Sequence, residues 1–231
     1  MQTLVRAIST LAIVMSVLGT VGLISRAFTP KSDVKLPRDV QSPGLAIEFA
    51  HLDEVKSMLG EARDGDSMRE KMRAALYKDY LFIAMYWLLF VGMSTLLIVS
   101  GRTWAMSAGV IAAVCATSAA IFDVVENLSI AALLDAAEIR NEMVRNVASA
   151  GFGKWLLVFL ATLIISLLFI RRDWVVLLGV LYLLIGVLGI YGLLRNQPRL
   201  VELAFGLYFV GVIGVAIVFT FFPRKILDQF K

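Results

Sequence analysis

The chain has 231 residues, of which 59% are hydrophobic and only 17% are charged, and its mean hydropathy is +0.83. This composition excludes an ordinary water-soluble domain and predicts a polytopic helical membrane protein. The formal net charge is +4, but the basic residues lie mainly at the ends of apolar runs. That pattern indicates contact with anionic lipid headgroups and gives no reason to expect a nucleic-acid partner.

Six apolar runs predict a single all-α membrane domain, a helical bundle with about six transmembrane helices. The first run is longer than the apolar part of a signal peptide, so we expect a retained helix. Small residues in the third and fifth runs predict close helix contacts (Ala108, Ala112, Ala116, Ala120; Gly179, Gly186, Gly189, Gly192). The expected spans are residues 4–24, 80–99, 104–126, 155–170, 174–194 and 200–222.

Residues 25–78 form the only polar segment of any size, between the first and second spans. Its first half carries three of the five prolines of the chain and predicts an extended loop. Two amphipathic helices are expected after it, and Met58, Met68 and Met72 fall on their apolar sides. Because no stop signal separates the second helix from the next span, we expect one long helix there. The segment is therefore predicted to form an interfacial helical cap.

An acidic motif follows the third apolar run. Asp123, Glu126 and Asn127 are spaced i, i+3 and i+4, so a helix places them on one face. The run from Trp104 to Leu134 is about 46 Å long as a helix, which exceeds a hydrocarbon core of about 30 Å. We therefore expect the span to leave the membrane near Asp123 and to continue as a surface helix to Gly151.

The serpentine order of the spans brings several polar residues to the membrane side that also holds the polar segment. Asp79 and Tyr86 near the start of the second span, and Lys154 before the fourth, lie on the side of Asp123, Glu126 and Asn127. Tyr191, Arg195 and Glu202 are expected on that side too. Two interpretations remain open: a polar binding pocket under the cap, or a structural ion pair that marks the membrane surface.

The orientation follows from the basic residues in the short connections. Seven lie on the side of the two termini and five on the opposite side, which predicts that both termini are cytoplasmic. The polar segment alone holds ten basic residues, and counting those near the first span reverses this orientation.

The sequence lacks the residue sets of common cofactor and catalytic sites. Cys115 and His51 are the only residues of their kinds, which excludes a Cys/His set for zinc, haem or iron–sulfur clusters. His51 precedes a helix and is interpreted as a capping or surface residue. A carboxylate-only metal site stays possible, but we expect no cofactor. No nucleophile–base arrangement, P-loop or dinucleotide fingerprint occurs, which favours a non-enzymatic protein.

Three short motifs carry a family resemblance. They are DYLFIAMY from Asp79 to Tyr86, FDVVEN from Phe122 to Asn127, and Lys154 followed by Trp155, and an AIEFA segment at residues 46–50 precedes them. Together they resemble a group of uncharacterised bacterial multi-pass membrane proteins over residues 1 to about 170. The resemblance implies a bacterial cytoplasmic membrane but no activity.

Two functional hypotheses follow. The first is a non-enzymatic binding or assembly component that takes a small amphiphile or a protein partner, besides membrane lipids, through the pocket of Asp79, Tyr86, Asp123, Glu126, Asn127 and Lys154. The second is a proton-coupled small transporter or a lipid-acting membrane enzyme in which Asp123 or Glu126 titrates.

Overall fold

The computed structural model describes residues 1–28, 42–59, 66–100, 102–170 and 175–227. The proline-rich loop, residues 171–174 and Lys231 lie outside the described residues, as does the side chain of Met68. Helices and the turns between them make up the described chain, and six of the helices are long and apolar enough to cross a membrane. The protein is therefore an all-α membrane bundle, as its composition predicts.

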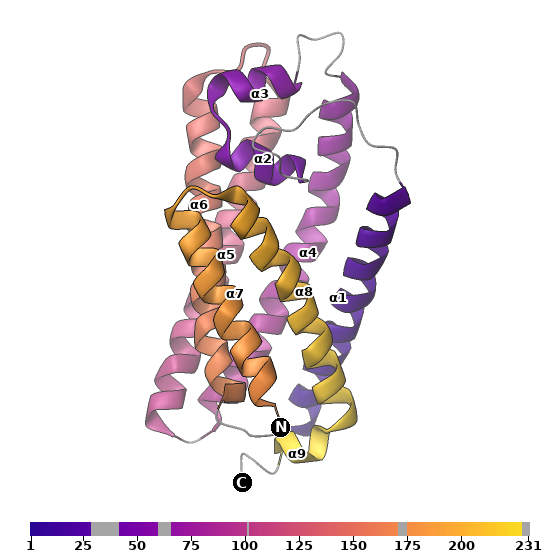
Figure 1. Ribbon diagram of the computed structural model, residues 1–231, viewed down its shortest axis with the longest axis vertical. Helices are drawn as coiled ribbons and strands as arrows, with labels where there is room; N and C mark the ends of the chain where they lie inside the picture. The colour runs from indigo at the N-terminus through magenta and orange to yellow at the C-terminus, as the bar shows by residue number, and fades with distance from the viewer. Residues whose placement is uncertain (29–41, 60–65, 101, 171–174, 228–231) are drawn as a thin grey trace.

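The described helices follow one another in a simple up-and-down order (Figure 1). The membrane-crossing helices are α1 (Gln2–Phe28), α4 (Asp66–Ile98), α5 (Thr103–Asp135), α6 (Asn141–Ile170), α7 (Val176–Leu194) and α8 (Pro198–Phe221). Two short helices, α2 (Pro43–Phe49) and α3 (Leu52–Leu59), come between α1 and α4 and are called the cap here. A last short helix, α9 (Pro223–Leu227), follows α8.

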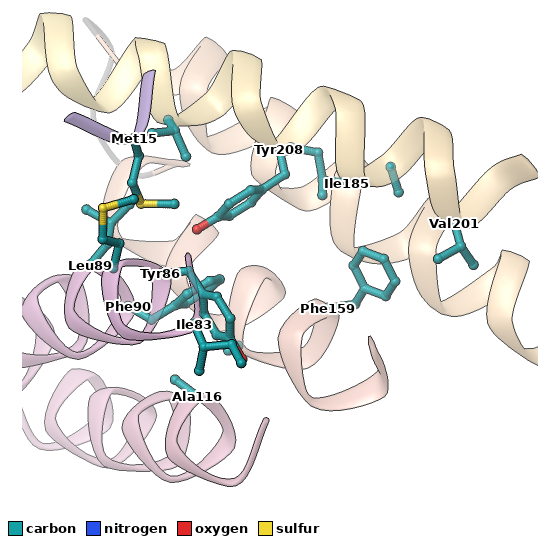
Figure 2. Packing of buried hydrophobic residues seen from close by; sticks show 14 of the residues in the cluster. Met15, Ile83, Tyr86, Leu89, Phe90, Ala116, Phe159, Ile185, Val201 and Tyr208 are labelled. Carbon is teal, nitrogen blue, oxygen red and sulfur yellow. The ribbon is translucent and has the colours of Figure 1, made fainter. Parts of the chain in front are cut away.

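The six long helices form a closed ring. Each of α4 to α8 packs against the next helix in the chain, and α1 closes the ring between α8 and α4. Aromatic side chains occupy the interior, where Phe90 of α4 stacks on Tyr208 of α8 with ring centroids 5.6 Å apart (Figure 2). Tyr182 of α7 and Phe159 of α6 are fully buried in the same core. Aromatic pairs at such separations contribute to core packing beyond the area that they bury.

Glycines let α7 approach its neighbours. A Cβ atom on Gly186 or Gly189 would collide with Leu163 or Phe159 of α6, and one on Gly192 would meet Leu200 of α8. This agrees with the close contacts that the spacing of these residues predicts. In α5 the buried small residues are Ala105, Gly109, Ala112, Ala116 and Ala119, whereas Ala108 and Ala120 are half-buried. The packed face of α5 is thus turned slightly from the expected one.

The helices differ in length, and this places the cap. α5 has 33 residues and α6 has 30, so they are about 50 and 45 Å long, whereas the 19 residues of α7 span about 28 Å. α4, α5 and α6 therefore extend beyond the turn between α7 and α8, and α2 lies near the level of that turn (Figure 1). Because α7 is just long enough to cross the hydrocarbon, we expect α2 to lie at the membrane interface.

The cap packs by its apolar residues. Leu45, Ala46 and Ile47 of α2 are buried, mainly against α6, and Met58 and Leu59 of α3 are buried as well. Met72 of α4 is buried, in agreement with its expected place on an apolar face. His51 is exposed, and its backbone N–H donates a 2.7 Å hydrogen bond to Glu54 Oε2, which fits the interpretation as a residue at a helix start.

Two helix boundaries can be compared with those predicted from the sequence. α4 runs unbroken from Asp66 into the membrane, as expected. The expected surface helix from Asp123 to Gly151 is not found, because α5 ends at Asp135 and α6 begins at Asn141. Arg69 of α4 donates hydrogen bonds of 2.8 and 3.4 Å to the carbonyl groups of Leu134 and Ala136. This contact satisfies carbonyls at the end of α5, where the helix leaves them without partners.

Candidate functional site

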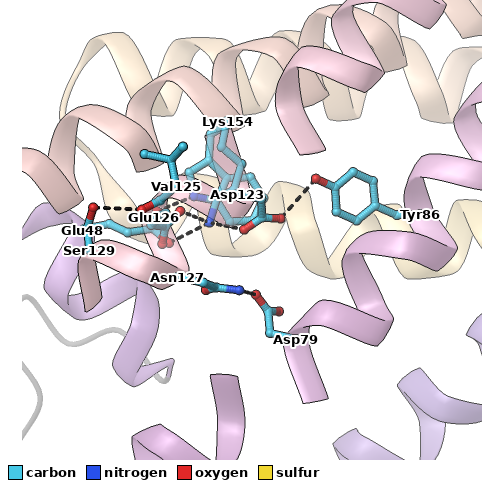
Figure 3. A network of polar contacts seen from close by, with 10 residues as sticks. Glu48, Asp79, Tyr86, Asp123, Val125, Glu126, Asn127, Ser129 and Lys154 are labelled. Atoms are coloured by element: carbon cyan, nitrogen blue, oxygen red, sulfur yellow. Dashed lines mark hydrogen bonds and ion pairs between the residues drawn. The ribbon is translucent and has the colours of Figure 1, made fainter. Parts of the chain in front are cut away.

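The centre of the polar region is the ammonium group of Lys154 on α6. Three carboxylates lie around its Nζ atom: Glu126 Oε2 at 2.5 Å, Glu48 Oε1 at 3.0 Å and Asp123 Oδ1 at 3.4 Å (Figure 3). Asp123 and Glu126 come from one face of α5, and Glu48 comes from the cap. These four residues are called the ion cluster here.

Glu48 joins the cap to the bundle. Its Oε1 atom accepts a hydrogen bond from Lys154, and its Oε2 atom accepts one from the indole N–H of Trp155. The side chain passes over Gly151, where a Cβ atom would lie 2.9 Å from both Cγ and Oε2 of Glu48. A glycine at 151 is therefore needed for this approach, and the part of α6 from Gly151 to Trp155 forms a socket for one carboxylate.

Two further hydrogen bonds connect α4 to this region. The Tyr86 hydroxyl donates to Asp123 Oδ2 over 3.0 Å, and Asn127 Nδ2 donates to Asp79 Oδ2 over 2.8 Å. Figure 3 shows Tyr86 pointing toward Asp123, whereas Asn127 and Asp79 form a separate pair beside the ion cluster. The two contacts join α4 to α5 beside the ion cluster.

The ion cluster is removed from solvent and unbalanced in charge. Each of its four residues is at most 7% exposed, and Glu126 Oε2 has no hydrogen-bond partner among the described residues besides its ion pair with Lys154. One ammonium group can balance one carboxylate, so two carboxylates are in excess when all are ionised. Burial of unbalanced charge is costly. The Glu48–Lys154 pair alone links the cap to α6, so Asp123 and Glu126 are not needed for that link.

The structure brings together all six residues predicted for the pocket. Three connected contacts join Tyr86, Asp123, Lys154 and Glu126, and Asn127 and Asp79 form an adjacent pair. Of the other polar residues expected on this side, Tyr191 is half exposed and lies by Arg195, and Glu202 accepts a hydrogen bond from the backbone N–H of Ser42. The described residues contain no group of three or more metal-ligating side chains arranged to hold an ion.

Sequence reasoning missed Glu48 and Trp155 as site residues. Glu48 is an acid with apolar neighbours on both sides, in the segment AIEFA. The reasoning that identified Asp123, namely that an acid in an apolar segment needs a partner, applies equally to Glu48. Trp155 follows Lys154 directly, and its N–H needs an acceptor when it is buried.

Comparison of the chain with models of known protein families, with curated proteins and with solved structures gives no match.

Proposed function

We propose that the protein is a non-enzymatic binding component of a membrane, in which the ion cluster is the polar part of a binding site covered by the cap. The observation that carries this proposal is the excess of carboxylates. Glu48 and Lys154 are enough to fix the cap by a one-to-one ion pair. Asp123 and Glu126 add negative charge beyond that need, and a buried charge kept without a stabilising reason suggests a role in binding.

The position of the ion cluster supports the same proposal. It lies at the membrane interface under a seven-residue helix, so movement of one short element would open it to the headgroup region. From the resemblance to bacterial multi-pass proteins, we propose that this membrane is the bacterial cytoplasmic membrane. We propose cytoplasmic termini, from the basic residues of the connections.

The double variant Asp123→Asn, Glu126→Gln tests the binding role. It leaves Glu48 and Lys154 as a balanced pair, so we expect the protein to insert, fold and keep its cap. We expect it to lose a bound amphiphile that wild-type protein carries when it is released from native membranes and weighed by native mass spectrometry.

The matched control neutralises two exposed carboxylates, in the variant Asp53→Asn, Glu142→Gln, and it should retain the amphiphile. A wild-type protein that carries no bound small molecule, or a double variant that keeps it fully, would contradict the proposal.

Proton coupling is the second candidate. It is favoured by the convergence of Glu48 and Glu126 on the same nitrogen, because two neighbouring carboxyl groups in a buried site can share one proton. In vesicles with a pH gradient, wild-type protein would then dissipate the gradient faster than the Asp123→Asn, Glu126→Gln variant. Equal rates in the two preparations would exclude this candidate.

A further inference from the structure

Four aromatic side chains lie between α4, α6 and α8, next to the ion cluster. Phe82 of α4 has its ring centroid 6.0 Å from Phe205 and 6.1 Å from Phe209 of α8, and Trp155 of α6 lies 5.3 Å from Phe205. All four side chains are only half-buried, although they lie between helices. They are called the aromatic face here, and they give the bundle an accessible apolar surface at this level.

The aromatic face is continuous with the ion cluster. The ring of Trp155 is part of the aromatic face, and its N–H donates a hydrogen bond to Glu48 of the ion cluster. The ring of Phe82 lies 5.6 Å from that of Tyr86, whose hydroxyl donates to Asp123. An apolar surface that adjoins excess carboxylates has the chemistry of a site for an amphiphile.

A second observation points to a ligand beside this face. The hydroxyl of Tyr208 has no hydrogen-bond partner among the described residues, although Tyr208 is only 4% exposed. Its side chain extends from α8 toward Phe90 and Tyr86 of α4 (Figure 2). Buried hydroxyl groups nearly always have a partner. The hydroxyl of Tyr182, whose ring lies 6.3 Å from that of Tyr208, also has none among the described residues. Of the two, Tyr208 is the one beside the aromatic face, 6.3 Å from Phe209, so its hydroxyl is the available acceptor for a polar group from outside the chain.

We infer that the ion cluster and the aromatic face together bind an amphiphile with a protonated amine headgroup and an apolar chain. This inference rests on the proposed binding function and names its ligand class. The positive headgroup balances one of the two excess carboxylates and donates to the Tyr208 hydroxyl, and aromatic rings stabilise cations. An anionic headgroup would add to the negative charge, and an uncharged one would leave the excess unchanged.

Trp155 offers a direct report of binding. In a variant with Trp87→Phe, Trp104→Phe and Trp174→Phe, Trp155 is the only tryptophan of the chain. The protein is reconstituted in phosphatidylcholine vesicles and titrated with three probes that share an 11-bromoundecyl chain and end in an amine, an alcohol or a carboxylate. Bromine quenches indole fluorescence at contact. The concentration used for each probe is that of the probe bound to the vesicles.

We expect the amine to quench Trp155 saturably, with a half-saturating concentration about tenfold below that of the alcohol, which corresponds to one favourable charge interaction. Neutralisation of Asp123 and Glu126 should remove this preference, and neutralisation of the exposed Asp53 and Glu142 should leave it. Tyr208→Phe, which removes only a hydroxyl, should weaken the amine and leave the alcohol unchanged.

Equal quenching by the three probes, or a preference for the carboxylate, would overturn the inference. If the amine shows no preference while native mass spectrometry finds another bound amphiphile, this inference is wrong and the proposed function stands. If neither experiment finds a ligand, both are wrong.

Discussion

Replacement of Lys154 by methionine is expected to destabilise the protein by about 3–5 kcal/mol, the usual cost of leaving a buried charge without its partner. Lys154 is the ammonium group on which Glu48, Asp123 and Glu126 converge. Methionine fills a similar volume but leaves three carboxylates facing one another. The free energy of unfolding, measured by titrating mild-detergent micelles with sodium dodecyl sulfate, tests this expectation.

The control is Lys71→Met, at an exposed position of α4, which should change the free energy of unfolding by less than about 0.5 kcal/mol. Combining Lys154→Met with Glu48→Gln, Asp123→Asn and Glu126→Gln should recover much of the loss, because no unpaired charge remains. A Lys154→Met protein as stable as the Lys71→Met control would show that the ammonium is not a structural centre.

Replacement of Gly151 by alanine is expected to release the cap. The added methyl group would lie 2.9 Å from Glu48 Cγ and 3.1 Å from its Cδ, so Glu48 must leave the socket or α2 must shift. In a Cys115→Ser background, a cysteine at position 50, where Ala50 is 7% exposed, should react with a membrane-impermeant maleimide several times faster when Gly151 is replaced. The comparison is made in intact vesicles of known orientation.

Gly206→Ala is the matched control. It is also a glycine within a long helix, but a Cβ atom there meets nothing within 4 Å, so labelling at position 50 should not change. Glu48→Gln should give an intermediate rate, because the amide keeps the shape of the side chain and loses its charge. Slow labelling in the Gly151→Ala variant would mean that α2 is held by its apolar residues alone.

Much of the bundle could be predicted because hydrocarbon imposes a simple rule on the chain. Long apolar runs must become helices that satisfy their own backbone groups, and consecutive helices must alternate in direction. That alternation alone predicts that Asp79, Tyr86, Asp123 and Lys154 lie on one side of the membrane. The side follows from the number of preceding spans and the approximate depth from the position within one span, so the sequence reveals both.

The contacts of the cap could not be predicted in the same way. Glu48 and Lys154 are 106 residues apart in the chain, and nothing in either local sequence specifies the other. In its local sequence, Gly151 is only a residue of low helix propensity. Its role in leaving room for the Glu48 side chain follows only from the tertiary contact. A short helix outside the hydrocarbon is not subject to the membrane rule, so its docking depends on tertiary contacts.

The end of α5 was mispredicted for a related reason. The residues from Asp135 to Arg140 contain no proline or glycine, so local signals favour a continuous helix. The break is supported by a side chain of another helix, because Arg69 binds the carbonyls of Leu134 and Ala136. Helix ends that depend on a distant donor are not visible in a local pattern.

The closure of the ring by α1 sets an order for biosynthesis. α1 packs mainly against α8, and the hydroxyl groups of Ser9 and Thr220 lie 2.6 Å apart across this contact. α1 is synthesised long before α8, so it must stay in the bilayer with one flank facing lipid while five further helices are inserted. Until α8 arrives, the aromatic interior is open along that flank, and a folding helper or a lipid can reach it during this interval.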